Sequence, residues 1–133
     1  MELTIFSDGG ARGNPGPAAA GIVIKNKENK IIAEFGKYLG EQTNNYAEYM
    51  ALILGLEKAK ELGATEVNCI LDSELVTKQM KREYKVKEPT LQKLFIKAYN
   101  LSQQFKKIEY KHTLRSGNKE ADTQVNKILD EQK

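Results

Sequence analysis

The chain has very little of the two residue types that build most transition-metal sites. Its 133 residues include one cysteine, Cys69, and one histidine, His112. A single cysteine cannot form an internal disulfide, and one residue of each type cannot supply the Cys/His ligand set of a zinc site. Because Cys69 falls within an apolar, strand-like stretch, we expect it to be a core residue.

Long hydrophobic runs are also missing. None approaches the ~18 residues of a membrane-spanning helix, and no basic-then-apolar leader opens the sequence. We therefore expect a cytoplasmic protein with no membrane partner. The composition, 40% hydrophobic and 29% charged, is typical of a soluble globular protein. The length suits one hydrophobic core, so we expect residues 1–133 to form a single domain.

The net charge of +3 is small, but its distribution is uneven. Between Lys78 and Lys97 the sequence carries a run of basic residues that only Glu83 and Glu88 interrupt. These are Lys78, Lys81, Arg82, Lys85, Lys87, Lys93 and Lys97. A local basic patch on a nearly neutral body indicates a polyanionic partner, although a solvated helix face would carry the same charges.

Residue patterns predict the order β-β-β-α-β-α-α-β-α. The strands are expected at Leu3–Phe6, Ala18–Lys25, Ile31–Leu39, Glu66–Asp72 and Lys107–His112. The helices are expected from Thr43 or Asn44 to about Leu62, over Ser73–Glu83, over Thr90–Phe105, and from about Asn118 onwards. Breaks are expected in the glycine-rich stretch 9–17 and at 40–42, 84–89 and 113–117. This order predicts an α/β fold in which helices cover a mixed sheet.

Three carboxylates are expected to meet at one edge of this sheet. Asp8 follows the first strand, Asp72 ends the fourth, and Glu48 lies near the start of the helix between them. A meander of three strands and a right-handed crossover would bring all three to the same edge. If the last strand is also parallel, Asp122 joins them. Considered alone, Asp8 could equally be the turn residue of a plain hairpin.

Such a group of carboxylates is expected to bind a cation that neutralises its charge. The acids would otherwise repel one another and raise their own pKa values. Oxygen ligands without Cys or His suit Mg²⁺, with Mn²⁺ as the alternative. Two such ions are suited to in-line displacement at a phosphodiester. A neighbouring basic patch would hold the rest of a nucleic acid strand.

Four motifs in a fixed order carry a resemblance to a known family: Asp8–Pro17, Thr43–Glu48, Asp72-Ser73 and Arg115–Asp122. With them, essentially the whole chain resembles the ribonuclease H type 1 family, in a compact form without a basic protrusion or a hybrid-binding domain. The resemblance implies an α/β ribonuclease H-like fold. Its five-stranded mixed sheet would have the order 3-2-1-4-5 and be flanked by helices.

The activity that this resemblance implies is that of a metal-dependent endoribonuclease. It would hydrolyse the RNA strand of an RNA–DNA hybrid with two ions, Mg²⁺ or Mn²⁺, leaving 5′-phosphate and 3′-hydroxyl ends. The implied catalytic and metal-binding residues are Asp8, Glu48, Asp72 and Asp122. The implied substrate contacts are Gly9, Gly10, Ala11, Arg12, Gly13, Asn14, Thr43, Asn44, Asn45, Ser73, Arg115 and Asn118. We expect a monomer.

Several alternatives stay open. His112 either assists product release, as a loop histidine does in some members, or is a structural or surface residue at a strand end. Arg115 contacts a phosphate, braces Asp122, or forms a salt bridge that orders its loop. Glu74 stands where many members have Gln, and an acid there would weaken hybrid binding. A hybrid-binding module without catalysis, or another nuclease or strand-transfer enzyme of the same fold, remains an alternative function.

Overall fold

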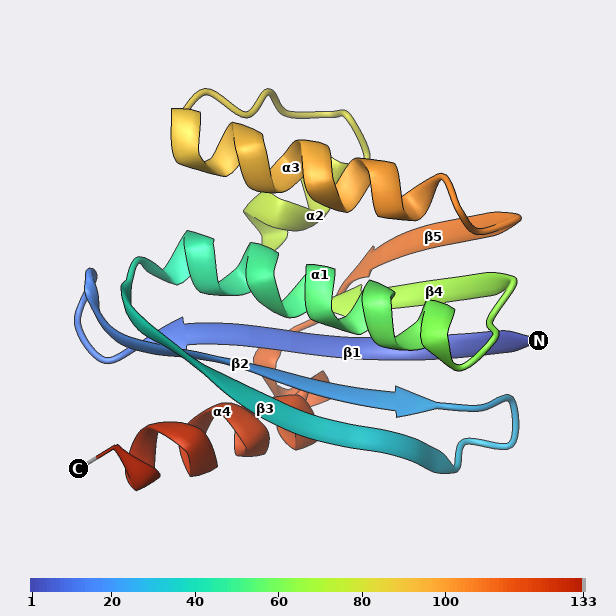
Figure 1. Ribbon diagram of the computed structural model, residues 1–133, viewed down its shortest axis with the longest axis horizontal. Coiled ribbons are helices and arrows are strands. Elements are labelled where there is room, and N and C mark those ends of the chain that lie inside the picture. Colours follow the sequence, from blue (N-terminus) through green and yellow to red (C-terminus); the bar gives the residue numbers. More distant parts are fainter. Residues whose placement is uncertain (133) are drawn as a thin grey trace.

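The computed structural model describes residues 1–132 and contains a five-stranded sheet with the order β3-β2-β1-β4-β5 (Figure 1). Three antiparallel strands form a meander: β1 (Glu2–Ala11), β2 (Gly16–Lys25) and β3 (Ile31–Gln42). Two further strands run parallel to β1: β4 (Glu66–Leu71) and β5 (Lys107–His112). The predicted mixed sheet and its strand order are therefore confirmed.

Helices cover both faces of the sheet. They are α1 (Asn44–Glu61), α2 (Glu74–Met80), α3 (Pro89–Ser102) and α4 (Lys119–Glu131), with a short 3-10 turn at Arg115–Gly117. α1 packs on β1 and β2, and α3 lies beside α1 (Figure 1). α4 packs on the opposite face, because Gly21 of β2 abuts Ala121 of α4 whereas the next residue, Ile22, faces Gly55 of α1. Among residues 1–132, no helix is long and apolar enough to cross a membrane.

The core lies between α1 and the sheet. α1 is buried on most sides, as its apolar middle predicts, and Tyr49 and Leu52 are 0% exposed. Small residues recur at every fourth position of α1, at Ala47, Ala51, Gly55 and Ala59. They allow a close approach, because a Cβ added to Gly55 would lie 2.6 Å from Cγ2 of Ile5. Cys69 is a buried free thiol in this core, as expected.

Three strands extend further than the sequence predicts. β2 begins at Gly16 instead of Ala18. β1 was expected to end at Phe6 and a loop to begin at Gly9, but β1 pairs with β2 through Ala11. β3 was expected to break at Gly40, yet a bulge forms there, with a φ of +76°, and pairing continues to Gln42. Glycine keeps its backbone hydrogen-bonding groups and its freedom at positive φ, so a strand can pass through it. The connection between β1 and β2 is therefore only residues 12–15.

The second helix is shorter than predicted. α2 ends at Met80 instead of Glu83. Arg82 has a φ of +67°, a left-handed conformation in which a right-handed helix cannot continue. Residues 81–88 consequently form a separate, non-helical segment between α2 and α3.

The third helix is displaced from its predicted bounds. α3 begins at Pro89 instead of Thr90 and ends at Ser102 instead of Phe105. Proline suits the first helical position because no N–H is needed there. Glu88 caps this start, since its two carboxylate oxygens accept from the first free N–H groups at 3.0 and 2.9 Å.

Candidate active site

Three carboxylates from three elements meet at one edge of the sheet. Asp8 belongs to β1, Glu48 to α1, and Asp72 directly follows β4. One oxygen of each lies within 4.8 Å of the others. β1 and β4 pair in parallel as far as Ser7 and Leu71, so the next residue of each strand emerges beside the other. The convergence expected from strand direction is observed.

Burial dominates the electrostatics of this carboxylate cluster, which we define as Asp8, Glu48 and Asp72. Asp8 is 4% and Glu48 is 7% exposed. Burial, followed by the charge of Asp72, raises the pKa of Asp8 to about 8. Burial and then the charge of Asp8 raise the pKa of Glu48 well above its usual range. Burial also raises the pKa of Asp72, which the Arg115 guanidinium opposes.

Glu48 is held on one side only. The Gly9 N–H donates to its Oε1 at 3.0 Å. Within residues 1–132 its buried Oε2 has no hydrogen-bond partner. A buried carboxylate oxygen without a donor is costly unless a cation compensates for it. An all-oxygen set with an unsatisfied buried oxygen fits a hard divalent ion such as Mg²⁺ or Mn²⁺.

The close contact between β1 and α1 brings Glu48 to the cluster. A Cβ added to Gly9 would overlap the carbonyl group of Ala47 and the backbone nitrogen of Glu48. Glycine at this position therefore has a steric reason. It lets the first turns of α1 approach the strand that carries Asp8.

Asp122 approaches the cluster from the other face of the sheet. It lies in the first turn of α4 and lines the same cleft. It is close enough to Asp8 to contribute to the raised pKa of that carboxyl. Asn126, one helical turn later, donates from Nδ2 to Asp122 Oδ2 at 3.3 Å. The sequence motifs do not single out Asn126, although the i,i+4 spacing on a helix indicates such a contact.

Most of the predicted site residues line one cleft around the cluster. They are Asp8, Gly9, Gly10, Ala11, Arg12, Asn44, Asn45, Glu48, Asp72, Ser73, Arg115 and Asp122, together with Val125, Asn126 and Leu129 of α4. The remaining predicted residues do not line it: Gly13, Asn14, Thr43, His112 and Asn118.

Polar residues at the start of α1 hold the connection of residues 12–15 in place. Asn44 Oδ1 accepts from the Ala11 N–H at 2.8 Å, and the Asn44 N–H donates to Asn14 Oδ1 at 3.0 Å. Thr43 caps α1, because its hydroxyl accepts from the Tyr46 N–H at 3.2 Å. These bonds fix one rim of the cleft.

Three other predicted contacts have defined surroundings. Arg12 Nη2 pairs with Asp130 Oδ1 at 2.7 Å. Ser73 Oγ caps α2 by accepting from the Val76 N–H at 3.2 Å. Arg115 lines the cleft and makes no ion pair within 4 Å in the part of the chain that the structure describes. The salt bridge that would order its loop is therefore not formed.

Asn118 has a structural role. Its side chain is 1% exposed, and its Nδ2 donates to the Ser7 carbonyl at 2.8 Å. It therefore ties the start of α4 to β1 next to Asp8, and its direct contact with substrate stays a prediction. His112 is exposed at the end of β5, outside the cleft lining, which is the position expected of a surface residue.

Comparison with known proteins extends over nearly the whole chain. A family model described as reverse transcriptase-like matches residues 6–128. The Bifunctional protein Rv2228c of Mycobacterium tuberculosis is 44% identical over 131 residues, which are 98% of this chain and 36% of that protein. Ribonuclease HI of Halobacterium salinarum is 39% identical over 126 residues, 95% of this chain and 63% of that protein. The chain thus spans about a third of the first relative's length (36%).

Solved structures of ribonuclease H1 proteins are also similar to this chain. RNase H1 of Halobacterium salinarum superposes with a TM-score of 0.96 at 37% identity, over 98% of this chain and 99% of that one. LC11-RNase H1, solved in complex with an RNA/DNA hybrid, gives a TM-score of 0.93 at 42% identity over 97% of both chains. The sequence relatives and the solved structures agree with the strand order and with the four motifs in the sequence. The chain therefore belongs to the ribonuclease H type 1 family.

Proposed function

We propose that this chain is a metal-dependent endoribonuclease that hydrolyses the RNA strand of RNA–DNA hybrids. The observation that carries the proposal is the cluster of Asp8, Glu48 and Asp72, whose oxygens lie within 4.8 Å while Glu48 Oε2 has no partner within residues 1–132. The hybrid bound to LC11-RNase H1, 42% identical to this chain, supports the choice of substrate. The proposal takes residues 1–133 as one ribonuclease H domain acting as a monomer.

The proposed metal ligands are the cluster and Asp122, and the proposed cofactor is two Mg²⁺ ions, with Mn²⁺ as a substitute. Such ions activate an attacking water and stabilise the leaving oxygen of a phosphodiester. The protein supplies the ligands on rigid elements, with the Gly9 N–H orienting Glu48 and Asn126 orienting Asp122. The ends expected after cleavage are 5′-phosphate and 3′-hydroxyl.

The rim of the cleft is proposed to bind the substrate. The backbone around Gly9–Gly13 and the side chains of Asn14 and Asn45 would face the ribose groups. Only RNA carries the 2′-hydroxyl, which is both a donor and an acceptor and so distinguishes the strand to be cut. Thr43 and Asn44 lie at the N-terminus of α1, where the helix favours a phosphate. Ser73 and Arg115 complete the proposed contacts.

A substrate panel tests the proposal. The full chain is incubated with an RNA–DNA hybrid, duplex RNA and duplex DNA, each with Mg²⁺, Mn²⁺ or chelator. We expect cleavage of the hybrid's RNA strand only when metal is present. Asp72→Asn should lose at least about 100-fold in rate, because several kcal/mol of charge stabilisation depend on the ions. The matched control is Asp130→Asn, which removes an exposed carboxylate paired with Arg12 and should keep most of the activity.

Each other result favours a different function. Hybrid that is bound but uncut with both metals would indicate a binding module without catalysis. Cleavage of duplex or branched DNA in preference to the hybrid would indicate another nuclease or a strand-transfer enzyme of the same fold. His112→Ala decides the role of the histidine. We expect most of the activity to remain, because His112 is exposed and lies outside the cleft lining.

A further inference from the structure

Two side chains bond to the backbone of the basic segment between α2 and α3: the buried Gln79, to the Lys85 carbonyl at 3.2 Å, and Gln92, to the Val86 carbonyl at 2.8 Å. This basic segment, residues 81–87, carries Lys81, Arg82, Lys85 and Lys87. None of these four forms an ion pair with another described residue, 1–132. In contrast, Lys78 on α2 is already paired with Glu74 at 3.3 Å. Arg82 lies over the rings of Phe95 and Tyr99, at 5.9 and 5.7 Å from their centres. Lys81, Lys85 and Lys87 are therefore the cations most available to a polyanion.

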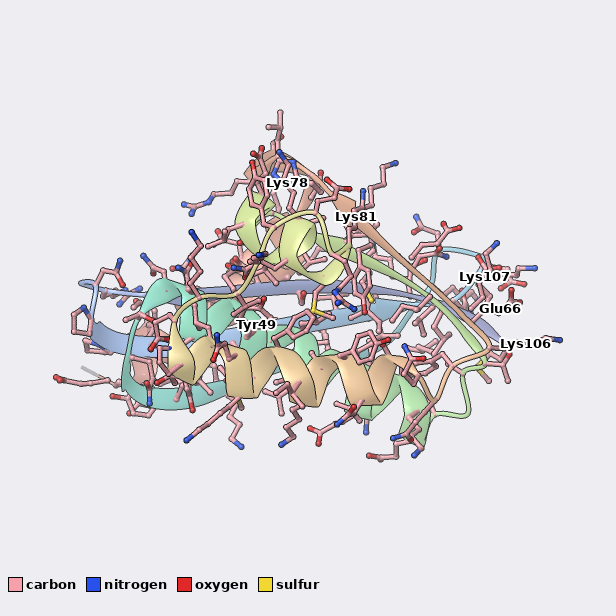
Figure 2. All side chains as sticks on the ribbon, turned by 90° about the horizontal axis from the view of Figure 1, so that it is seen from above. Tyr49, Glu66, Lys78, Lys81, Lys106 and Lys107 are labelled. Carbon is pink, nitrogen blue, oxygen red and sulfur yellow. The ribbon has the colours of Figure 1, made fainter. Side chains whose placement is uncertain are left out.

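The basic segment begins a short distance from the carboxylate cluster. α2 starts directly after Asp72 and Ser73, and it is seven residues long. At about 1.5 Å per residue, α2 spans roughly 10 Å. Figure 2 shows Lys78 and Lys81 at the margin of the molecule and Tyr49 in its interior. A hybrid with one phosphate at the cluster can thus reach the basic segment with neighbouring phosphates.

Gln79 connects this segment to α1. The Tyr49 hydroxyl donates to Gln79 Oε1 at 2.6 Å, and Gln79 Nε2 donates to the Lys85 carbonyl at 3.2 Å. Tyr49 is 0% and Gln79 is 4% exposed, so the bond between them is shielded from water, while the bond to Lys85 is partly buried. Tyr49 directly follows Glu48 in the sequence. The chain of contacts therefore leads from the helix of a cluster residue to the backbone of the basic segment.

The chemistry of the partners sets the direction of both bonds. A carbonyl oxygen only accepts, so the Gln79 amide must turn its NH₂ toward Lys85. Its oxygen then faces Tyr49, whose hydroxyl is free to donate. Leucine or methionine would fill the same space but leave the Lys85 carbonyl without this donor.

We infer that Gln79 is a positioning residue. It fixes the position of the basic segment relative to the carboxylate cluster, so that both can bind the same hybrid. The inference rests on the proposed function, which supplies the hybrid. Cations on a fixed backbone lose less conformational entropy on binding than cations on a free loop. Breaking the Gln79–Lys85 bond should therefore lower the affinity for the hybrid. The carboxylates, and hence the rate of the chemical step, should stay unchanged.

The test compares Gln79→Met with Tyr49→Phe in the full chain. Tyr49→Phe removes only the bond between Tyr49 and Gln79, whereas Gln79→Met removes this bond and the bond to Lys85. A fall in Tm of about 4–10 °C is therefore expected for each variant, with the larger fall in Gln79→Met. Only Gln79→Met removes the bond to the Lys85 carbonyl and so loosens the basic segment. It should weaken binding of an RNA–DNA hybrid in chelator about 5–10-fold and reduce the slope of log K against log[salt] by about 1–2, as expected when one or two phosphate contacts are lost. Tyr49→Phe should change the affinity by less than about twofold and the slope by less than about 0.5, which is below the effect of one phosphate contact.

Two further measurements separate positioning from a loss of stability. In Gln79→Met, KM should rise with kcat unchanged, and amide hydrogen exchange should accelerate across residues 81–88. Equal weakening in both variants, or wild-type binding and exchange in Gln79→Met, would overturn the inference and leave the proposed function intact. Failure of the wild-type protein to bind the hybrid at all would overturn both.

Discussion

Replacing Asp8 by Asn should stabilise the metal-free protein at alkaline pH and leave its stability nearly unchanged in acid. The pKa of Asp8 is raised from 3.8 to about 8 in the folded protein, chiefly by burial and then by the charge of Asp72. Between these two values the folded state keeps a proton that the unfolded state releases. Stability is therefore fully present below about pH 4 and is lost as the pH rises toward 8.

The size of the effect follows from this shift. Each pKa unit corresponds to about 1.4 kcal/mol, which sets a ceiling of about 6 kcal/mol for the whole shift. Glu48 or Asp72 can hold the proton instead, so we expect Asp8→Asn to gain about 2–4 kcal/mol at about pH 9. For a chain of this length that is a rise in Tm of roughly 6–15 °C.

Thermal unfolding in chelator, at about pH 4 and about pH 9, measures the gain. Asp130→Asn is the matched control, because its carboxylate is 60% exposed and should contribute within about 1 kcal/mol at both pH values. Adding Mg²⁺ at alkaline pH should raise the Tm of the wild type more than that of Asp8→Asn. The Tm difference between the two proteins should therefore become smaller. An equal Tm difference at both pH values would refute the reasoning, since it would show that burial of the charge is not the cause.

Other consequences can be measured on the same protein. Gly9→Ala should lower the free energy of unfolding by about 3 kcal/mol or more, because its Cβ would overlap the backbone of Ala47. Gly10→Ala, whose Cβ meets its nearest atom at 3.8 Å, should stay within about 1 kcal/mol in the same urea titration. Burial raises the pKa of the Cys69 thiol, so a thiol reagent should label it only as fast as the protein unfolds. Glu74→Gln should tighten hybrid binding at low salt, because it removes an acid from the start of α2; unchanged affinity would show that Glu74 lies away from the phosphates.

The secondary structure was predictable where a local pattern has one solution. β4 alternates buried and half-buried residues, so its start at Glu66 and its inner face, including Cys69, follow from the sequence, although it ends at Leu71 instead of Asp72. Thr43 caps α1 as its residue type predicts. The convergence of Asp8 and Asp72 was predictable because parallel neighbouring strands end at the same edge.

Other features depend on contacts that no local pattern contains. Gly9 and Gly40 indicate breaks when their backbone freedom is considered alone, but pairing with β2 carries both strands through these residues. The left-handed Arg82 ends α2 early, and its guanidinium lies 5.9 Å from the ring centre of Phe95, a residue of another helix. Asn118 belongs to a family motif, and the structure shows that its side-chain Nδ2 donates to the Ser7 carbonyl.

The sequence by itself determined which acids are present, which elements carry them, and the edge of the sheet at which they meet. Residue type, periodicity and strand direction suffice for these, because they are local or topological properties. Only the tertiary structure decided that Glu48 has one satisfied oxygen and one without a partner within residues 1–132, and that Gln79 donates to the backbone of the basic segment at Lys85. The physical reason is that burial and hydrogen-bond satisfaction are set by residues far apart in the chain. Gly9 and Glu48 are separated by 39 positions, and Ser7 and Asn118 by 111.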